Sequence, residues 1–142
     1  MTAEMAAAMQ TFRDYADDDG SAGLAGIVPT GRTFLRAVQD RVATRAMYAP
    51  DAATDRLIAL WFNDGTHARA HGSYLSALTL FGSLTGLDPQ SLGRHEQAAF
   101  DLGISPDGAW ALQRVAALEL DFAAAVPEPG QAALLAAGLL GL

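Results

Sequence analysis

The region between Asn63 and Pro89 constrains the fold of this chain more than any other part of the sequence. It begins with a glycine-containing turn, in which Asp64 stands three residues before His67. Apolar and small residues then recur at intervals of three and four, the spacing of one face of an α-helix; they are Tyr74, Leu75, Leu78, Phe81, Gly82 and Thr85. The sequence therefore predicts a carboxylate and an imidazole on a turn that is anchored by an apolar helix.

The Asp64–His67 pair has the chemistry of a catalytic base and its partner. A neutral imidazole accepts a proton near pH 7, and an adjacent carboxylate fixes its tautomer and stabilises the imidazolium. A spacing of three across a turn allows the carboxylate to reach Nδ1 and leaves Nε2 free to face a nucleophile. Spacing alone also allows a second interpretation, in which Asp64 simply caps the helix that follows.

His71 adds a metal-site hypothesis, because it lies four residues after His67 and would share its face on a helix. Asp64 and the two histidines form a D-x-x-H-x-x-x-H pattern, whose residue types can bind a divalent metal. The sequence places no third strong ligand and lacks the HExxH arrangement. We therefore expect no metal and no other cofactor, and His71 is then a polar neighbour at the start of the helix.

Composition restricts the class of partner and of chemistry. The chain has 142 residues, enough for about one domain with a single core, and 51% of them are hydrophobic, many being alanine. Its formal net charge is −7, with nine arginines and no lysine, which argues against a nucleic-acid partner. The absence of cysteine excludes disulfides, cysteine-ligated zinc and thiol catalysis.

The segments before this region are expected to alternate between helix and strand. Residues 2–16 have the spacing of an amphipathic helix rather than the pattern of a secretory signal peptide. Residues 24–31 suit a buried strand and turn, and residues 33–45 a second helix. Residues 56–62 suit a short strand or an extended approach to the turn at 63–65. This order indicates an α/β fold.

Further helices are expected beyond Pro89. One runs from Ser91, as a candidate cap, to Gly103, and the next begins with a cap at Ser105 and a first-turn proline, Pro106. The latter carries an apolar stripe with the spacing of a core helix: Trp110, Leu112, Val115, Ala116 and Leu118. The acidic run at residues 17–19 is interpreted as a solvated helix end, since it lacks the spacing of a calcium loop.

The quoted turn and helix carry a resemblance to a known family. Asp64, His67, Gly72, Tyr74 and Leu75, followed by Thr85, Gly86 and Pro89, resemble the C-terminal block of the SGNH (GDSL-like) hydrolases. In that family an Asp-x-x-His motif supplies two members of a catalytic triad and is followed by G-x-YL and TG-x-x-P. Residues 26–38, GIVPTGRTFLRAV, are similar to a family segment in which a strand leads through a turn to a helix.

The resemblance covers roughly residues 5–120 and implies both fold and function. Residues 1–122 would form the C-terminal part of a three-layer, flavodoxin-like α/β hydrolase fold that is rich in helices. The chain would belong to a serine ester hydrolase acting on acyl or acetyl esters. Asp64 would orient His67, and His67 would act as the general base.

The family's nucleophile and oxyanion donors have no counterpart in the sequence. No GDS motif occurs, and Ser21, in DGSAG, is better interpreted as part of an acidic surface loop. A base without these groups should have almost no triad activity. The alternative to a hydrolase is therefore an inactive fragment or a partner-binding domain, and exposed apolar faces would favour self-association.

Residues 123–142 form a separate segment with a second resemblance. Pro127, Glu128 and Pro129 precede an apolar run from Ala132 to Leu142, as in PEP-CTERM sorting signals. This resemblance implies export to the cell envelope, membrane association and processing by an exosortase-type protease. The apolar run is shorter than the roughly 20 residues of a spanning helix, and no basic cluster follows it. The segment is thus a truncated signal or a short packed or amphipathic helix.

Overall fold

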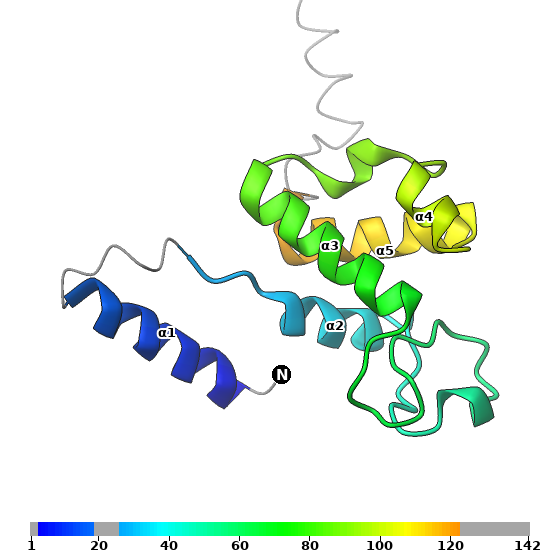
Figure 1. The fold of residues 1–142 in the computed structure, drawn as a ribbon, viewed down its shortest axis with the longest axis horizontal. Helices are drawn as coiled ribbons and strands as arrows, with labels where there is room; N and C mark the ends of the chain where they lie inside the picture. The colour runs from blue at the N-terminus through cyan, green and yellow to red at the C-terminus, as the bar shows by residue number, and fades with distance from the viewer. Residues whose placement is uncertain (1–2, 19–25, 123–142) are drawn as a thin grey trace, which may run out of the picture.

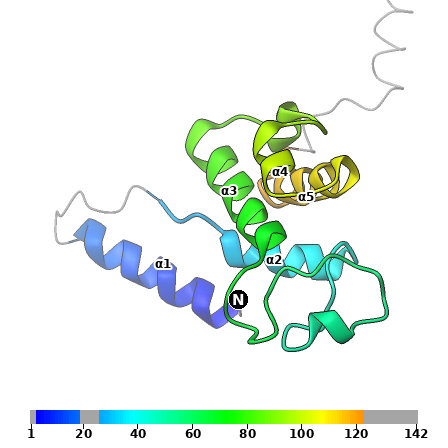
Figure 2. The ribbon, with the colours of Figure 1, turned by 45° about the vertical axis from the view of Figure 1, so that its right-hand side comes forward.

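The computed structural model describes residues 3–18 and 26–122, and these residues form a helical fold (Figure 1). The helices, in chain order, are α1 (Ala3–Asp18), α2 (Thr30–Gln39), the 3₁₀ helix η1 (Pro50–Ala52), α3 (Ala70–Thr85), the 3₁₀ helix η2 (Pro89–Leu92), α4 (Gln97–Asp101) and α5 (Pro106–Glu119). In Figures 1 and 2, α1 lies to one side of the group formed by α2, α3 and α5. The predicted N-terminal helix is thus present as α1, although its side-chain stripe falls partly on residues that are not described.

The prediction of an α/β, three-layer flavodoxin-like fold is wrong, because residues 3–18 and 26–122 contain no β-strand. Residues 26–29 belong to no helix or strand, and residues 56–62 make only isolated bridges. Ile58 pairs in parallel with Ala43, and Trp61 pairs in antiparallel fashion with Ala68. A short apolar run becomes a strand only when neighbours satisfy its backbone groups along its length. Here each partner segment turns away after one bridge.

The core lies where α2, α3 and α5 pack against one another. Most of the α3 stripe predicted from the sequence is buried, namely Tyr74, Leu75, Leu78 and Gly82, whereas Thr85 is exposed. The α5 stripe contributes Leu112, Val115 and Ala116, all fully buried. The predicted start of α5 is confirmed, since the Ser105 hydroxyl accepts the N–H of Gly108 at 3.1 Å and Pro106 is the first helical residue.

Two predicted helices have different bounds in the structure. The helix expected over 33–45 is α2, which ends at Gln39 because Arg41 adopts a left-handed conformation with φ of 58°. The helix expected from Ser91 is replaced by η2 and the short α4. Glu96 caps α4 in place of Ser91, since its carboxylate accepts the N–H groups of Ala98 and Ala99 at 2.9 and 2.6 Å.

Glu119, at the end of α5, holds that helix against α2. Its side chain is only 4% exposed, and Oε2 accepts a hydrogen bond of 2.8 Å from Nε of Arg36. Nε of Arg32 lies 2.8 Å from Oε1 as an ion pair, without the alignment of a hydrogen bond. The hydrogen bond that Arg36 donates to Glu119 raises the pKa of Arg36, so the guanidinium stays charged. The two helices are therefore joined by charge as well as by apolar contacts.

Replacing Glu119 with glutamine is expected to lower the free energy of unfolding by about 1–2 kcal/mol, since a charged hydrogen bond is lost at a buried position. Urea denaturation at pH 7 measures the change. The matched control is Asp107→Asn, which breaks the exposed Arg94–Asp107 pair, in which Asp107 is 91% exposed. That change should cost no more than about 0.5 kcal/mol. Equal losses for the two variants would contradict the role given to Glu119.

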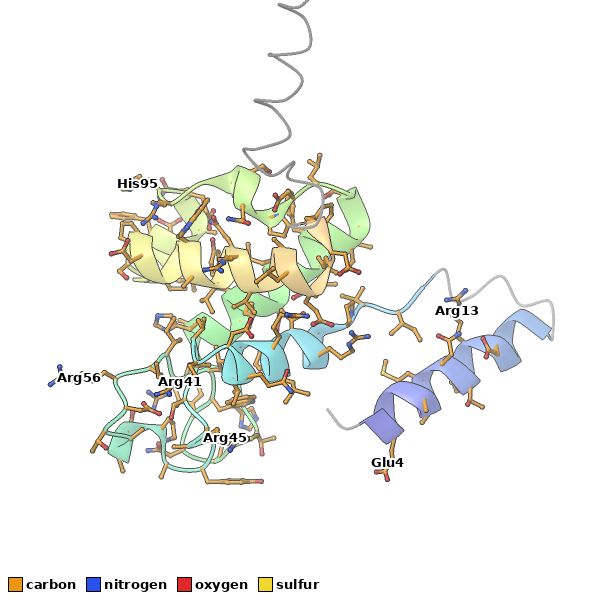
Figure 3. All side chains as sticks on the ribbon, turned by 180° about the vertical axis from the view of Figure 1, so that it is seen from behind. Glu4, Arg13, Arg41, Arg45, Arg56 and His95 are labelled. Carbon is orange, nitrogen blue, oxygen red and sulfur yellow. The ribbon has the colours of Figure 1, made fainter. Side chains whose placement is uncertain are left out.

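The segment between α2 and α3 carries the loop that holds Asp64 and His67. Figure 3 shows the side chains of Arg41, Arg45 and Arg56 on this segment, while those of Glu4 and Arg13 lie on α1. The segment contains η1 and both β-bridges, and it is closed by the start of α3 at Ala70.

Candidate functional site

Asp64 and His67 lie in a tight loop that is closed by backbone hydrogen bonds. The N–H of Phe62 donates to the carbonyl of His67 at 2.8 Å, and the N–H of Arg69 donates to the carbonyl of Leu60 at 2.9 Å. Gly65 supplies the reversal with φ of +66°, a conformation that costs glycine little. The turn predicted at this position is present, and α3 begins directly after it.

The Asp64 carboxylate bonds to both the ring and the backbone of this loop. Its Oδ2 lies 2.7 Å from Nδ1 of His67, and its Oδ1 accepts the N–H groups of Thr66 and His67 at 2.9 and 3.0 Å. In the neutral imidazole, Nδ1–H therefore donates to the carboxylate, and Nε2 carries the free lone pair. Among the described residues, none forms a hydrogen bond with Nε2, and the His67 side chain is 77% exposed.

The interpretation of Asp64 as a cap of the following helix is wrong. Arg69 is the N-cap residue of α3, and no side chain makes a capping hydrogen bond there. Asp64 instead satisfies backbone N–H groups inside its own turn. The contact that the spacing predicted, between the carboxylate and Nδ1, is present. Its catalytic use stays a prediction.

Hydrogen bonds hold the pKa of Asp64 well below its usual range. The backbone N–H of His67 has the largest effect, followed by the His67 ring and the N–H of Thr66. All of these donors favour the ionised carboxylate. Asp64 is therefore negatively charged at any pH at which His67 can serve as a base.

The carboxylate of Asp64 should remain ionised under acid conditions that protonate ordinary aspartates, whose pKa is about 3.9. Because the folded pKa is lowered, the linked stabilisation is present above the unfolded pKa and is lost as pH falls towards the folded one. In His67→Ala the pKa should rise only part of the way, since the two backbone N–H donors remain. A ¹³C NMR titration of the carboxyl carbons measures both values. An ordinary pKa in the unmutated chain would contradict this assignment.

His71 does not join the pair as a metal ligand. It lies inside α3, whereas His67 precedes the helix, so the two imidazoles do not share a helical face. Burial, and to a smaller extent the charge of Arg69, lowers the pKa of His71. No group of three or more His, Asp or Glu side chains in the described parts of the chain is arranged to hold a metal. Added zinc should leave the thermal stability unchanged.

The described serine hydroxyls that make hydrogen bonds do so locally. Ser76 donates to the carbonyl of Gly72 at 3.1 Å, Ser91 donates to the carbonyl of Asp88 at 2.6 Å, and Ser105 caps α5. Across residues 3–18 and 26–122, no hydroxyl bonds to His67. Ser21 and residues 123–142, in which a sorting signal was predicted, lie outside the described residues.

Sequence reasoning missed the residues that hold this loop in place. Asp51, in η1, forms a two-point ion pair with Arg69 through N–O distances of 2.8 Å, and it also accepts Nδ2 of Asn63 at 2.9 Å. The guanidinium of Arg69 lies 5.3 Å from the ring centre of Phe62. These contacts join residues 12 and 18 positions apart across an irregular segment, where no periodicity marks them.

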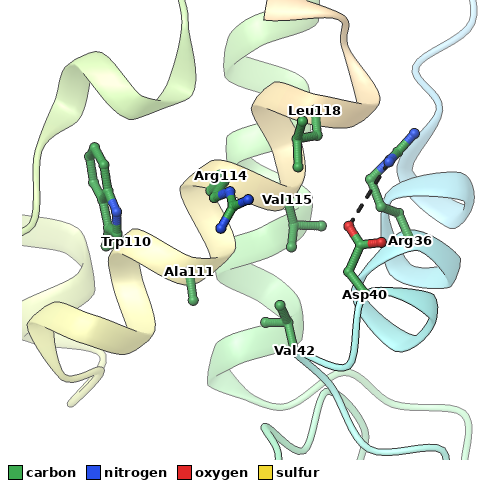
Figure 4. Close-up of a pocket in the computed structure, with 8 residues that line it drawn as sticks. All are labelled: Arg36, Asp40, Val42, Trp110, Ala111, Arg114, Val115 and Leu118. Carbon is green, nitrogen blue, oxygen red and sulfur yellow. Dashed lines mark ion pairs between the residues drawn. The ribbon is translucent and has the colours of Figure 1, made fainter. Parts of the chain in front are cut away.

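A separate groove of about 450 Å³ lies between α2 and α5 (Figure 4). It contains the ion pair between Arg36 and Asp40, at 3.9 Å, beside Trp110 and Arg114. Neither Asp64 nor His67 lines it. The groove is thus not part of the Asp64–His67 site.

Comparisons with protein-family models, with curated proteins and with solved structures give no match. In the described ranges, no helix is both long enough and apolar enough to cross a membrane.

Proposed function

We propose that Asp64 and His67 form the acid–base half of a serine ester hydrolase that acts on acyl or acetyl esters. The observation that carries the proposal is the 2.7 Å contact between Oδ2 of Asp64 and Nδ1 of His67, with Nε2 left accessible. This is the arrangement in which an imidazole removes a proton from a hydroxyl while its partner carboxylate stabilises the imidazolium. The resemblance of residues 64–89 to SGNH hydrolases supplies the reaction class.

In this proposal the serine and the oxyanion donors come from polypeptide other than the 142 residues of this chain. His67 would accept the serine proton through Nε2 as the hydroxyl attacks the ester carbonyl, and would then return it to the leaving alcohol. Asp64 stays ionised throughout and keeps the ring in the tautomer that makes Nε2 the acceptor. The chain alone then lacks the nucleophile and should show no triad turnover.

A fluorescent fluorophosphonate, which labels activated serines, tests whether His67 of this chain activates a serine of another polypeptide. A polypeptide with a GDS-type serine, encoded next to or in frame with this chain, is mixed or fused with it. Fast labelling of the GDS serine should require the chain with His67 intact, and His95→Ala serves as the matched control because His95 is also exposed. Equally fast labelling of a serine within this chain alone would contradict the proposal.

We also propose that residues 123–142 direct the chain to the cell envelope. Support comes from the resemblance of the Pro127–Glu128–Pro129 segment to a sorting signal. Fractionation of cells that express the chain with and without residues 123–142 tests this. The same distribution in both cases would contradict it.

A second candidate function, a domain that binds another protein chain, is favoured by exposed apolar side chains. Leu80 and Leu84 are four residues apart on α3 and share a face, with Leu84 76% and the following Leu87 56% exposed. We expect the chain to self-associate, and the double change of Leu84 and Leu87 to glutamine to reduce this. Light scattering measures the mass, and a monodisperse monomer would contradict the expectation.

A further inference from the structure

The loop that carries His67 is fixed from outside by two residues of another segment, Tyr48, which precedes η1, and Asp51, which lies in η1. On one side, the Asp51 carboxylate forms a two-point ion pair with Arg69, with both N–O distances 2.8 Å. It also accepts a hydrogen bond of 2.9 Å from Nδ2 of Asn63. On the other side, the Tyr48 ring packs on Gly65, where an added Cβ would lie 2.5 Å from ring carbons. Asn63 precedes the turn and Arg69 follows it, so the Asp51 carboxylate contacts both ends of the turn.

These contacts act on the turn itself. Asn63 precedes Asp64 directly, and Arg69 follows His67 by two residues. Inside the turn, the Asp64–His67 contact depends on both backbone positions, because both side chains are exposed and little else packs on them. The Arg69 guanidinium also lies 5.3 Å from the Phe62 ring centre, which places its charge against an apolar surface. A two-point arginine–carboxylate pair fixes orientation as well as distance.

We infer that Asp51 and Arg69 are positioning residues for the His67 base, which they hold in the tautomer with the proton on Nδ1. They do not reach the ring themselves, and they act through the backbone of the turn. The inference rests on the proposed function for its catalytic meaning, but the tautomer of His67 can be observed without any substrate. A purely structural ion pair would change stability and leave the His67 tautomer unchanged.

The experiment is long-range ¹H–¹⁵N NMR of the imidazoles in the whole chain, at a pH where His67 is neutral. The variants are Asp51→Ala, Asp64→Ala as the reference for a freed ring, and Asp107→Ala as a control that removes a different exposed ion pair. The unmutated chain and the control should show mainly the Nδ1–H form. Asp51→Ala should show at least half of the shift towards the Nε2–H form that Asp64→Ala causes.

Two results would overturn the inference. One is a shift in Asp64→Ala with none in Asp51→Ala; the other is no shift in Asp64→Ala, which would mean that Asp64 does not set the tautomer. If Asp51→Ala does not fold, the same NMR measurement on Arg69→Lys tests the inference, because lysine keeps the charge but cannot form the two-point pair. The tautomer should then shift in Arg69→Lys, and no shift would overturn the inference. If Asp51→Ala shifts the tautomer but serine labelling does not depend on His67, only the hydrolase proposal is rejected.

Discussion

Replacing Gly72 with alanine is expected to lower the free energy of unfolding by about 2–4 kcal/mol, as overpacking does in a dense interior. Gly72 lies in the first turn of α3, and an added Cβ would approach the carbonyl oxygen of Leu60 to 2.3 Å. That carbonyl also accepts the N–H of Arg69, so it cannot move without disturbing the loop of Asp64 and His67. Thermal and urea denaturation measure the loss.

Gly82 provides the matched control within the same helix. An added Cβ there would meet the end of the Leu120 side chain at 2.5 Å, which can rotate away, rather than backbone. Alanine is favoured over glycine by about 1 kcal/mol in a helix interior, and Gly82→Ala gains this in full, whereas Gly72→Ala, in the first turn, gains less. Gly82→Ala should therefore cost less than half as much as Gly72→Ala. A smaller loss at Gly72 than at Gly82 would contradict the packing described for the start of α3.

Replacing His67 with alanine should reduce ester hydrolysis about 10³-fold or more when the chain is combined with the serine-bearing polypeptide. The reason is that removing the base from a triad leaves only the contribution of binding and of the oxyanion donors. The value of kcat should fall while KM changes little, since His67 acts in the chemical step. Steady-state kinetics with p-nitrophenyl acetate measures both.

The control for this experiment is His95→Ala, which removes an exposed imidazole from a different part of the chain. Its activity should equal that of the unmutated chain. Asp64→Asn should also lose activity, because an amide in place of the carboxylate no longer stabilises the imidazolium. An active His67→Ala variant would exclude His67 as the general base.

The sequence predicted the parts of the structure that depend on neighbouring residues. The turn at Asn63, the contact between Asp64 and His67, the buried stripe of α3 and the Ser105 cap all follow from spacings of a few residues. Local hydrogen bonds and helical periodicity determine such features, so a single sequence contains the information for them.

The features that depend on distant partners were mispredicted or missed. The segment around Ile58 has the composition of a strand, but its state depends on whether other segments satisfy its backbone, and only an isolated bridge to Ala43 forms. The sequence pattern did not mark Asp51 or Glu119, because Asp51 meets Arg69, and Glu119 meets Arg36, only after the chain has folded back on itself. The α/β prediction failed for this reason, and the residues that hold the candidate site in place were missed for the same reason.

Hydrolysis of p-nitrophenyl acetate by this chain alone, compared between the unmutated protein, His67→Ala and His95→Ala, tests the Asp64–His67 pair directly. We expect no triad turnover, but a slow reaction driven by the accessible Nε2 of His67. This reaction should fall several-fold in His67→Ala and stay unchanged in His95→Ala. Equal rates for the unmutated protein and His67→Ala would contradict the claim that Asp64 and His67 form a working acid–base pair.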